Sequence, residues 1–189
     1  MGFTRAELQA FRGRSVPDLM PEHPRLVFVG INPGLWTAAT GAHFAYPGNR
    51  FYPALAAAGI ISRLPRIDDD GMAEADRRMF LDAGIGISNL VRRATARADE
   101  LTRDELREGA ADLTRAVAQW KPRVVAVVGL TAYRQGFRRP KALAGRQDGM
   151  LAGAELWVVP NPSGLNAHDT VATLAEAYAA PARAAGILP

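Results

Sequence analysis

The sequence predicts an α/β protein, a three-layer α/β/α sandwich around a central, mainly parallel sheet of four to five strands. Short apolar runs recur along the chain, and segments with helical patterns separate them. The apolar runs are nearly continuous, as expected of strands covered on both faces. The 189 residues can form one domain with its own core. We therefore expect a single domain over residues 1–189, in which residues 1–24 form an N-terminal helix and connector.

The first half of the chain is expected to alternate helices with two buried strands. Thr4 begins a capping-box pattern, which predicts the start of a short helix. Ala75, Met79 and Phe80 should face the core from a later amphipathic helix. The expected elements are helices at 4–13, 49–58 and 72–82, strands at 26–31 and 85–91, an extended connector at 15–24, a long loop at 32–48 and a polar connector at 62–71.

The second half continues this alternation. Thr102 begins another capping box, and Gly153 is the expected turn of a hairpin. Asp169 or Thr170 should cap the last helix. The expected elements are helices at 102–120, 131–137 and 170–185, strands at 123–129 and 156–159, a hairpin over 151–159, an arginine-rich loop up to 101 and a basic loop at 138–148.

The composition narrows the classes of site. The chain has no cysteine, so disulfides, thiolate nucleophiles and cysteine-ligated clusters are excluded. No apolar run approaches the roughly 18 residues of a membrane span, and no secretory signal is seen, so we expect a cytoplasmic protein without a membrane partner. The net charge of +4 fits a polyanionic partner, but arginine is abundant throughout and would raise the charge without one.

Two loops share one pattern, in which an apolar strand is followed by Asn-Pro and small residues. They are Gly30-Ile31-Asn32-Pro33-Gly34 and Pro160-Asn161-Pro162-Ser163-Gly164-Leu165. In open α/β sheets, ligands bind outside the carboxyl ends of the strands, so both loops should meet at one edge. Asn-Pro and Pro-Gly are also common turn dipeptides, so either loop alone would be a weak signal. Asn32 is the first candidate for chemistry.

Other patterns of catalysis are missing from the sequence. There is no phosphate-binding GxxxxGK[ST] motif, and Gly84-Ile85-Gly86 lacks the third glycine of a dinucleotide site. The three histidines have no metal-ligand spacing, so neither a metal nor a cofactor is expected. Ser163 lies in no Gly-x-Ser-x-Gly elbow, which favours a turn or phosphate-binding hydroxyl over a nucleophile.

Several segments match the motifs of one family in order and spacing. They are Gly30 to Leu35, Thr40-Gly41, Phe44-Ala45, Asn49-Arg50-Phe51, Gly86 to Val91, Arg107-Glu108-Gly109 and Asn161 to Leu165. These residues resemble the mismatch-specific uracil/thymine DNA glycosylases, the Mug/TDG branch of the uracil-DNA glycosylase superfamily. The likeness covers about residues 15–180. It implies a uracil-DNA glycosylase-like fold and one glycosylase domain.

The resemblance also implies an activity in base excision repair. The reaction would be hydrolysis of the N-glycosidic bond of uracil, and of other mispaired or damaged bases such as thymine or etheno-cytosine, leaving an abasic site. A base within a duplex is out of reach, so it would be flipped out. The implied partner is double-stranded DNA with a mismatched or damaged base, with single-stranded DNA left open. A monomer near the bacterial nucleoid is implied.

The family motifs imply roles for individual residues of the pocket. Asn32 would orient the attacking water, and Phe44 would stack on the flipped base. Gly34 lies where uracil-exclusive relatives carry a tyrosine, so it would leave room for the thymine methyl group. Backbone N–H groups of residues 31–35, Ile31 included, would bind the carbonyl oxygens of the base. Asn89 and Thr95 would support the water and the site.

A second set of residues would contact the DNA. Leu165, preceded by Gly164, would enter the base stack as a wedge, and Asn161 and Ser163 would shape the loop and bind phosphate. The bacterial prototype has an arginine near Asn166 and His168, and this chain has none there. Either Asn166 or backbone carbonyls would recognise the opposite guanine, or discrimination between the strands would be weak, and His168 would contact phosphate. The candidates for contacts to the DNA backbone are Arg92, Arg93, Arg97, Arg138, Arg139, Lys141 and Arg146.

Two other functions remain open from the residues alone. One is a DNA-damage binding module with weak or lost catalysis, against which the presence of Asn32 argues. The other is a different nucleotide-processing α/β enzyme. No glycine-rich cofactor loop follows the first strand, which argues against the second alternative.

Overall fold

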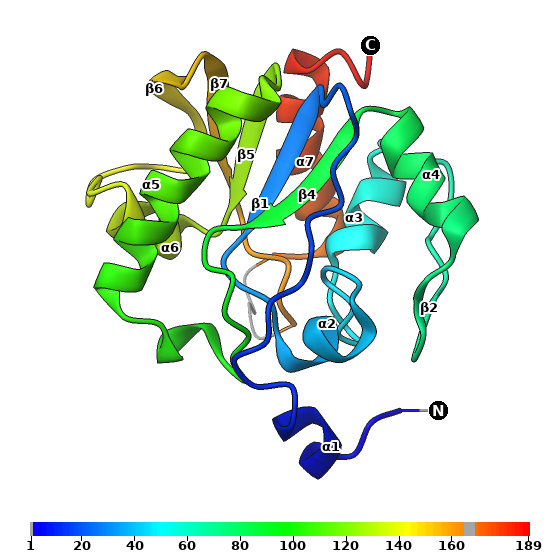
Figure 1. Cartoon of the computed structure of the whole chain (residues 1–189). Helices are drawn as coiled ribbons and strands as arrows, with labels where there is room; N and C mark the ends of the chain where they lie inside the picture. Colours follow the sequence, from blue (N-terminus) through cyan, green and yellow to red (C-terminus); the bar gives the residue numbers. More distant parts are fainter. Residues whose placement is uncertain (1, 165–168) are drawn as a thin grey trace.

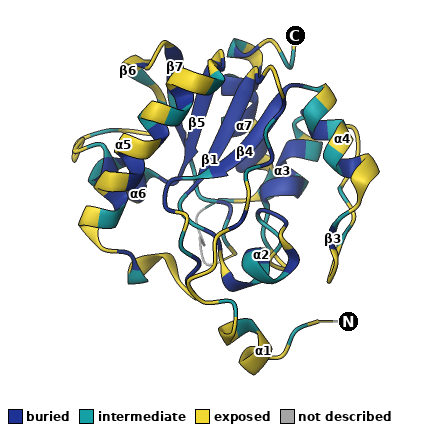
Figure 2. Cartoon of the chain, in the orientation of Figure 1, coloured by how far each residue is buried: buried dark blue, intermediate teal, exposed yellow. Residues whose placement is uncertain are grey.

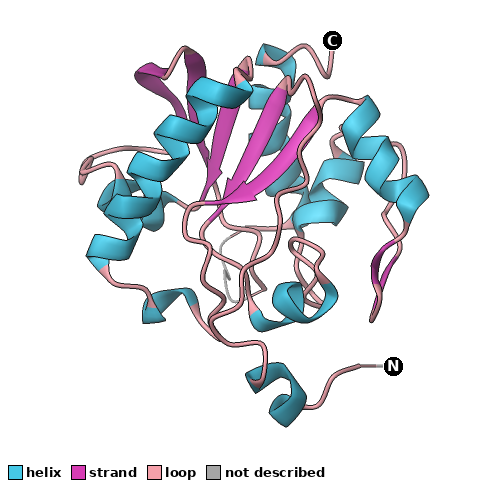
Figure 3. Ribbon diagram, in the orientation of Figure 1, coloured by secondary structure: helices cyan, strands magenta, loops and turns pink. Residues whose placement is uncertain are grey.

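The chain folds around a five-stranded sheet with helices on both faces (Figures 1 and 3). The computed structural model describes residues 2–164 and 169–189. The strand order is β4-β1-β5-β7-β6, and only the β6–β7 pair is antiparallel. The predicted fold class is therefore confirmed. The strands are β1 (Leu26–Gly30), β4 (Ile85–Asn89), β5 (Val124–Val128), β6 (Gly145–Leu151) and β7 (Ala154–Val159).

Alternate residues of each central strand face different helical layers, which is why these strands are apolar throughout. Phe28 of β1 is fully buried against the first layer, and Val27 and Val29 are fully buried against the second. Figure 2 shows the strands β1, β4 and β5 as the most buried part of the molecule. The first layer holds α3 (Phe51–Ala57), α4 (Glu74–Asp82) and α7 (Val171–Ala184), and the second holds α5 (Arg103–Trp120) and α6 (Leu130–Gly136).

Smaller elements lie beyond the carboxyl edge of the sheet or beside α4. At the carboxyl edge, α1 (Arg5–Gln9) packs on α2 (Leu35–Thr40), and the ring centroids of Phe3 and Trp36 lie 5.3 Å apart. The 3₁₀ helix η1 (Ala98–Glu100) follows the loop after β4. A two-stranded hairpin of β2 (Ile67–Asp68) and β3 (Gly71–Met72) precedes α4.

Three helices begin at the residues that local sequence predicts. The hydroxyls of Thr4, Thr102 and Thr170 each accept a hydrogen bond from the backbone N–H three residues later. Within α5, Gly109 allows a close approach, because an added Cβ there would lie 2.2 Å from the carbonyl oxygen of Leu90. The helix therefore rests directly on the backbone that follows β4.

Four local predictions were wrong. The polar connector expected at 62–71 contains β2 and the first residue of β3, which pair with each other. The expected loop at 32–48 contains α2, which buries Leu35, Thr37 and Thr40 and ends at Gly41 in the left-handed conformation. The expected basic loop at 138–148 runs into β6, because pairing with β7 extends the hairpin. In α4, Ala75 is exposed and Asp76 is buried instead, where it accepts from the N–H of Arg66 at 2.8 Å and pairs with Arg63.

A search for membrane-spanning elements covered residues 2–164 and 169–189. Within them, no helix is both long enough and apolar enough to cross a bilayer.

Candidate active site

A pocket of about 170 Å³ lies at the carboxyl edge of the sheet, where the loops after β1, β4 and β7 meet. Nine of the predicted site residues line it: Ile31, Asn32, Gly34, Phe44, Asn89, Thr95, Arg97, Asn161 and Ser163. The sequence did not single out the remaining lining residues for this site, which are Thr37, Tyr46, Asn49, Ala96, Ala98 and Val128. The structure thus brings together two loops more than a hundred residues apart.

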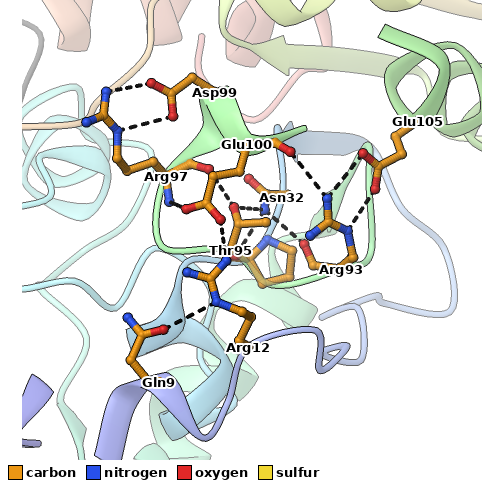
Figure 4. A network of polar contacts seen from close by, with 10 residues as sticks. Gln9, Arg12, Asn32, Arg93, Thr95, Arg97, Asp99, Glu100 and Glu105 are labelled. Carbon is orange, nitrogen blue, oxygen red and sulfur yellow. Dashed lines mark hydrogen bonds and ion pairs between the residues drawn. The ribbon is translucent and has the colours of Figure 1, made fainter. Parts of the chain in front are cut away.

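The amide of Asn32 is held in one orientation by its nitrogen. Nδ2 donates to the hydroxyl of Thr95 at 2.7 Å and to the carbonyl oxygens of Arg93 at 2.9 Å and Pro33 at 3.2 Å. Figure 4 shows this cluster. Because a carbonyl oxygen can only accept, the nitrogen must face these partners. Within the described residues Oδ1 of Asn32 has no hydrogen bond, so this oxygen is an acceptor that a ligand in the pocket can use.

Thr95 transmits this constraint to the next loop. Its hydroxyl accepts from Asn32 and donates to the carbonyl oxygen of Arg97 at 2.7 Å, so both of its roles are used. The N–H of Thr95 also donates to the carbonyl oxygen of Pro33 at 3.1 Å. Thr95 is 1% exposed, so these hydrogen bonds are shielded from water. The loop after β4 is thereby fixed beside the turn that carries Asn32.

Ion pairs brace the outer side of this loop. Arg93 donates from Nε and Nη2 to the two carboxylate oxygens of Glu105, at 2.7 and 3.1 Å. This bidentate pair, with the N–H of Thr102, lowers the pKa of Glu105 to about 2. Arg97 pairs with Asp99 at 2.5 Å, and Arg12 pairs with Glu100 (Figure 4). The backbone carbonyl of Arg93, which accepts from Asn32, belongs to this braced segment.

Phe44 forms an apolar wall of the pocket. Its backbone has a φ of 54°, a conformation that non-glycine residues rarely adopt. The ring stacks on Phe51, with centroids 3.9 Å apart and planes 19° from parallel. One face of Phe44 is therefore covered by α3, and the rest of the ring is available to a planar ligand in the pocket.

The second loop is shaped by its own asparagine and by Arg50. The Oδ1 of Asn161 accepts from the N–H of Ser163 at 3.0 Å, which closes a tight turn. The Arg50 guanidinium donates to the carbonyl oxygens of Ser163, at 2.6 Å, and Asp169. The N–H of Arg50 donates to the carbonyl oxygen of Pro162 at 3.0 Å. A side chain at the head of α3 thus ties the second loop to the first helical layer.

The open side of the pocket is lined by small residues and by polar groups. An added Cβ on Gly34 would meet no atom within 4 Å, so this position borders open space. Tyr46 is 57% exposed at the rim. Asn49 accepts at Oδ1 from the N–H of Phe51 at 2.9 Å, but the N-cap of α3 is Arg50, one residue later than an N-cap at Asn49 would place it. Because the pocket is open on this side, a ligand can extend out of it past Gly34 and Tyr46.

Some predicted site residues are not at this pocket. Arg92 pairs with Asp18 at 2.9 Å and lines a separate depression of about 260 Å³ beside α5. Gly164 is exposed, next to the carbonyl oxygen of Gly48. Leu165, Asn166 and His168 lie outside the described residues. Arg146 pairs with Glu155, whereas within residues 2–164 and 169–189 no ion pair is found for Arg138, Arg139 and Lys141.

The donor set suits a neutral, polar, planar ligand. In the described part of the chain, no group of three or more histidine, aspartate or glutamate side chains could hold a metal ion. The polar and aromatic side chains that line the pocket are asparagine amides, threonine and serine hydroxyls, the rings of Phe44 and Tyr46, and Arg97, whose charge is paired with Asp99. Such groups can orient a water molecule and hold a planar heterocycle. An amide does not titrate, so none of the asparagines can accept a proton as a general base.

Two of the matches to known proteins bear on this site. A family model described as the uracil DNA glycosylase superfamily matches residues 17–181. A solution structure from Methanosarcina acetivorans, assigned provisionally as a uracil DNA glycosylase, is similar with a TM-score of 0.62 and 17% sequence identity. The alignment covers 91% of this chain and 98% of that one. At this identity the structural likeness shows the fold, and the family model shows the family.

Proposed function

Because the chain belongs to the uracil DNA glycosylase superfamily, we propose that it is a mismatch-specific uracil/thymine DNA glycosylase of the Mug/TDG type. Superfamily membership supports a DNA glycosylase that hydrolyses the bond between uracil and deoxyribose. The finer proposal adds a slow, monofunctional enzyme that also accepts thymine or etheno-cytosine opposite guanine. The observation that carries it is Asn32, whose amide nitrogen is tied down while Oδ1 faces the pocket.

The proposed reaction uses water as the nucleophile. Oδ1 of Asn32 accepts a hydrogen bond from the water and directs its oxygen at C1′ of the flipped nucleotide. The bond from the water oxygen to C1′ forms as the C1′–N bond breaks, and the electron pair of the breaking bond leaves with the base. The proton that the water loses passes to solvent, and the departing base anion takes up a proton from solvent. Because an amide does not titrate, the activation barrier must be lowered by positioning of the water and by stabilisation of the leaving base anion. Backbone N–H groups of residues 31–35 are proposed to bind the carbonyl oxygens of that anion.

Phe44 and Gly34 are proposed to set which bases enter. The ring of Phe44, supported from behind by Phe51, offers a stacking surface of the kind worth ~1–3 kcal/mol per base. The open space at Gly34 would admit the methyl group of thymine or the extra ring of an etheno adduct. The loop at 160–165 is proposed to hold the DNA backbone, with Leu165 filling the vacated stack.

The experiment that tests the activity is a cleavage assay on a panel of labelled oligonucleotides. Single strands and duplexes carrying uracil, thymine or etheno-cytosine opposite guanine are incubated with the protein and then treated with alkali. Strand scission at the modified base reports an abasic product, and the Asn32→Ala protein serves as the matched control. Scission confined to uracil would reject the mismatch-specific proposal. A shifted but uncut duplex would favour a damage-binding module instead.

Gly34 provides the test of base choice. Its φ of −75° is accessible to any residue, so Gly34→Tyr should fold. We expect this variant to retain cleavage of uracil and to lose cleavage of thymine by about tenfold or more, in line with a steric clash of one methyl group. Gly34→Ala, which adds only one carbon, should keep both activities. Equal loss of both bases in Gly34→Tyr would contradict the proposed role.

A further inference from the structure

A buried histidine lies directly behind the pocket and is not used in the reaction described above. His43 is 4% exposed and precedes Phe44. Both nitrogens of its ring have a partner: Nε2 lies 3.0 Å from the carbonyl oxygen of Pro17, and Nδ1 lies 3.1 Å from Nδ2 of Asn89. Its own carbonyl oxygen accepts from the hydroxyl of Tyr52 at 2.6 Å. The ring is therefore held from both sides.

The partner at Nε2 decides the state of the ring. The carbonyl oxygen of Pro17 can only accept, so Nε2 must carry a proton. Burial lowers the pKa of His43 below its ordinary value, and the ring is neutral near pH 7. Among the nearby charges, Asp18 favours the charged form of the ring, and Arg77 and Arg92 oppose it. A neutral ring with its proton on Nε2 has a lone pair at Nδ1.

That lone pair decides the orientation of Asn89. The amide group facing Nδ1 must be the donor, because the amide oxygen there would oppose one lone pair with another. Oδ1 of Asn89 is thereby turned to the other side, beside Gly30 and the ring edge of Phe44. An added Cβ on Gly30 would lie 2.7 Å from this oxygen and 3.2 Å from Phe44. Glycine at position 30 therefore leaves space for the oriented amide.

The oriented oxygen belongs to the pocket. Asn89 lines the same space as Phe44 and Asn32, and among the described residues nothing donates to its Oδ1. Next to the stacking ring, the pocket thus presents an acceptor. A base that offers an N–H group at this edge gains a hydrogen bond, whereas a base that offers a lone pair meets electrostatic repulsion.

We propose that His43 is a positioning residue that fixes the amide of Asn89 with its oxygen toward the base, so that the site selects bases with an imide N–H. Uracil and thymine carry this donor at N3, and cytosine carries a lone pair there. Etheno-cytosine, whose N3 is part of the added ring, offers no N–H either, so it should bind more weakly than uracil or thymine. This inference rests on the proposed glycosylase function, because it assumes that the pocket holds a base. It assigns the preference to the proton position on a histidine that does not itself touch the base.

The first measurement is the state of the ring, which requires no activity. Nitrogen chemical shifts of His43 should show a neutral ring protonated at Nε2 at pH 7 and above. A ring that is charged at pH 7, or protonated at Nδ1, would overturn the proposal. Because this result is independent of catalysis, it stands apart from the proposed function. A wild-type protein that cleaves none of the panel would reject the glycosylase and leave the tautomer measurement intact.

The second measurement is base preference with two variants. Affinity is measured for duplexes with uncleavable 2′-fluoro-deoxyuridine or 2′-fluoro-deoxycytidine opposite an abasic-site analogue, so that neither base is paired and the cost of unpairing does not enter the comparison. We expect wild type to prefer the uracil duplex by about tenfold, from one hydrogen bond gained or refused. His43→Phe should reduce the preference to within about threefold, with unchanged affinity for unmodified duplex. His43→Asn, which retains an acceptor near the position of Nδ1, should restore it. A folded His43→Phe protein with the wild-type preference would overturn the proposal.

Discussion

Asn32 follows β1 and Asn161 follows β7, and each asparagine precedes a proline at the same edge of the sheet. The first uses its amide nitrogen within the protein, on Thr95 and two backbone carbonyls, and presents its oxygen to the pocket. The second uses its amide oxygen within the protein, on the N–H of Ser163. In these hydrogen bonds the two asparagines use opposite atoms of the amide. The difference separates a residue that we propose to act in the reaction from a residue that shapes its own loop.

The two loops also differ in the contacts that hold them in place. The first loop is bound to the segment after β4, which ion pairs of Arg93, Arg97 and Arg12 hold in place. The second loop is tied to α3 through Arg50 and backbone carbonyls. Acidic side chains are thus part of the first support, whereas residues 160–164 include no ionisable side chain. The comparison can be tested by changing each loop separately.

The largest effect is expected for Asn32→Ala. Loss of the oriented acceptor should reduce single-turnover cleavage of a uracil duplex by about a hundredfold or more, as expected when a nucleophile loses its positioning. Affinity for the duplex should stay near that of wild type, because the pocket walls remain. Gel-shift titration and single-turnover kinetics on the same samples check both points. A wild-type rate in Asn32→Ala would refute the role of this residue.

A smaller effect is expected for Thr95→Val, which removes the hydroxyl between Asn32 and Arg97. The carbonyl oxygens of Arg93 and Pro33 still hold the amide, so the rate should fall by about tenfold, the worth of one buried hydrogen bond. Thr95→Ser keeps the hydroxyl and serves as the control. If Thr95→Val and Thr95→Ser behave alike, the hydroxyl does not orient Asn32.

Asn161→Ala should have a still smaller effect, and of another kind. It removes the turn hydrogen bond to Ser163, so affinity for duplex and the cleavage rate should each fall by about fivefold. Asn161→Asp retains an acceptor at Oδ1 and should keep most of the wild-type values. If Asn161→Ala were as damaging to the rate as Asn32→Ala, the proposed division between the loops would be wrong.

The smallest effect is expected from acid. The pKa of Glu105 is lowered to about 2, so its pair with Arg93 stabilises the folded state above about pH 4.5. This contribution is lost as the pH falls toward 2. A carbon-detected titration of the Glu105 carboxyl group should show a midpoint near 2. In Glu105→Gln, the local stability of the first loop should depend less on acidic pH than in wild type, and the rest of the protein should be unaffected. A midpoint near 4.5 would show that the pair does not form.

Local sequence signals predicted much of the fold. The threonine caps and the valine-rich strand β5 are determined by neighbouring residues, so they were placed to within one or two positions. The helix α2 was missed because it has six residues and a glycine at each end. The start of β6 was missed because its charged residues become a strand only by pairing with β7. Tertiary contacts override local preference in both cases.

The residues of the site were predicted through motifs, and their orientations were not. Asn32, Phe44 and Asn161 stood in patterns that a reader of the sequence can find. His43 contacts Pro17, which lies 26 positions earlier in the chain, and Arg50 contacts Ser163, which lies 113 positions later. No spacing rule reveals contacts of this kind. The one available signal for His43 was its position beside Phe44 in a loop already suspected of function. Which atom of an asparagine faces a pocket follows only from its partners.

Gly109 has a consequence for redesign of this protein. Replacing a helical glycine by alanine is a common way to gain about 1 kcal/mol of stability. In α5 alanine cannot replace Gly109, because the new carbon would lie 2.2 Å from the carbonyl oxygen of Leu90. It would push the helix off the segment that carries Asn89. The neighbouring exposed positions, Glu108 and Ala111, carry no such restriction. Engineering of this helix can therefore vary its surface while its one glycine stays.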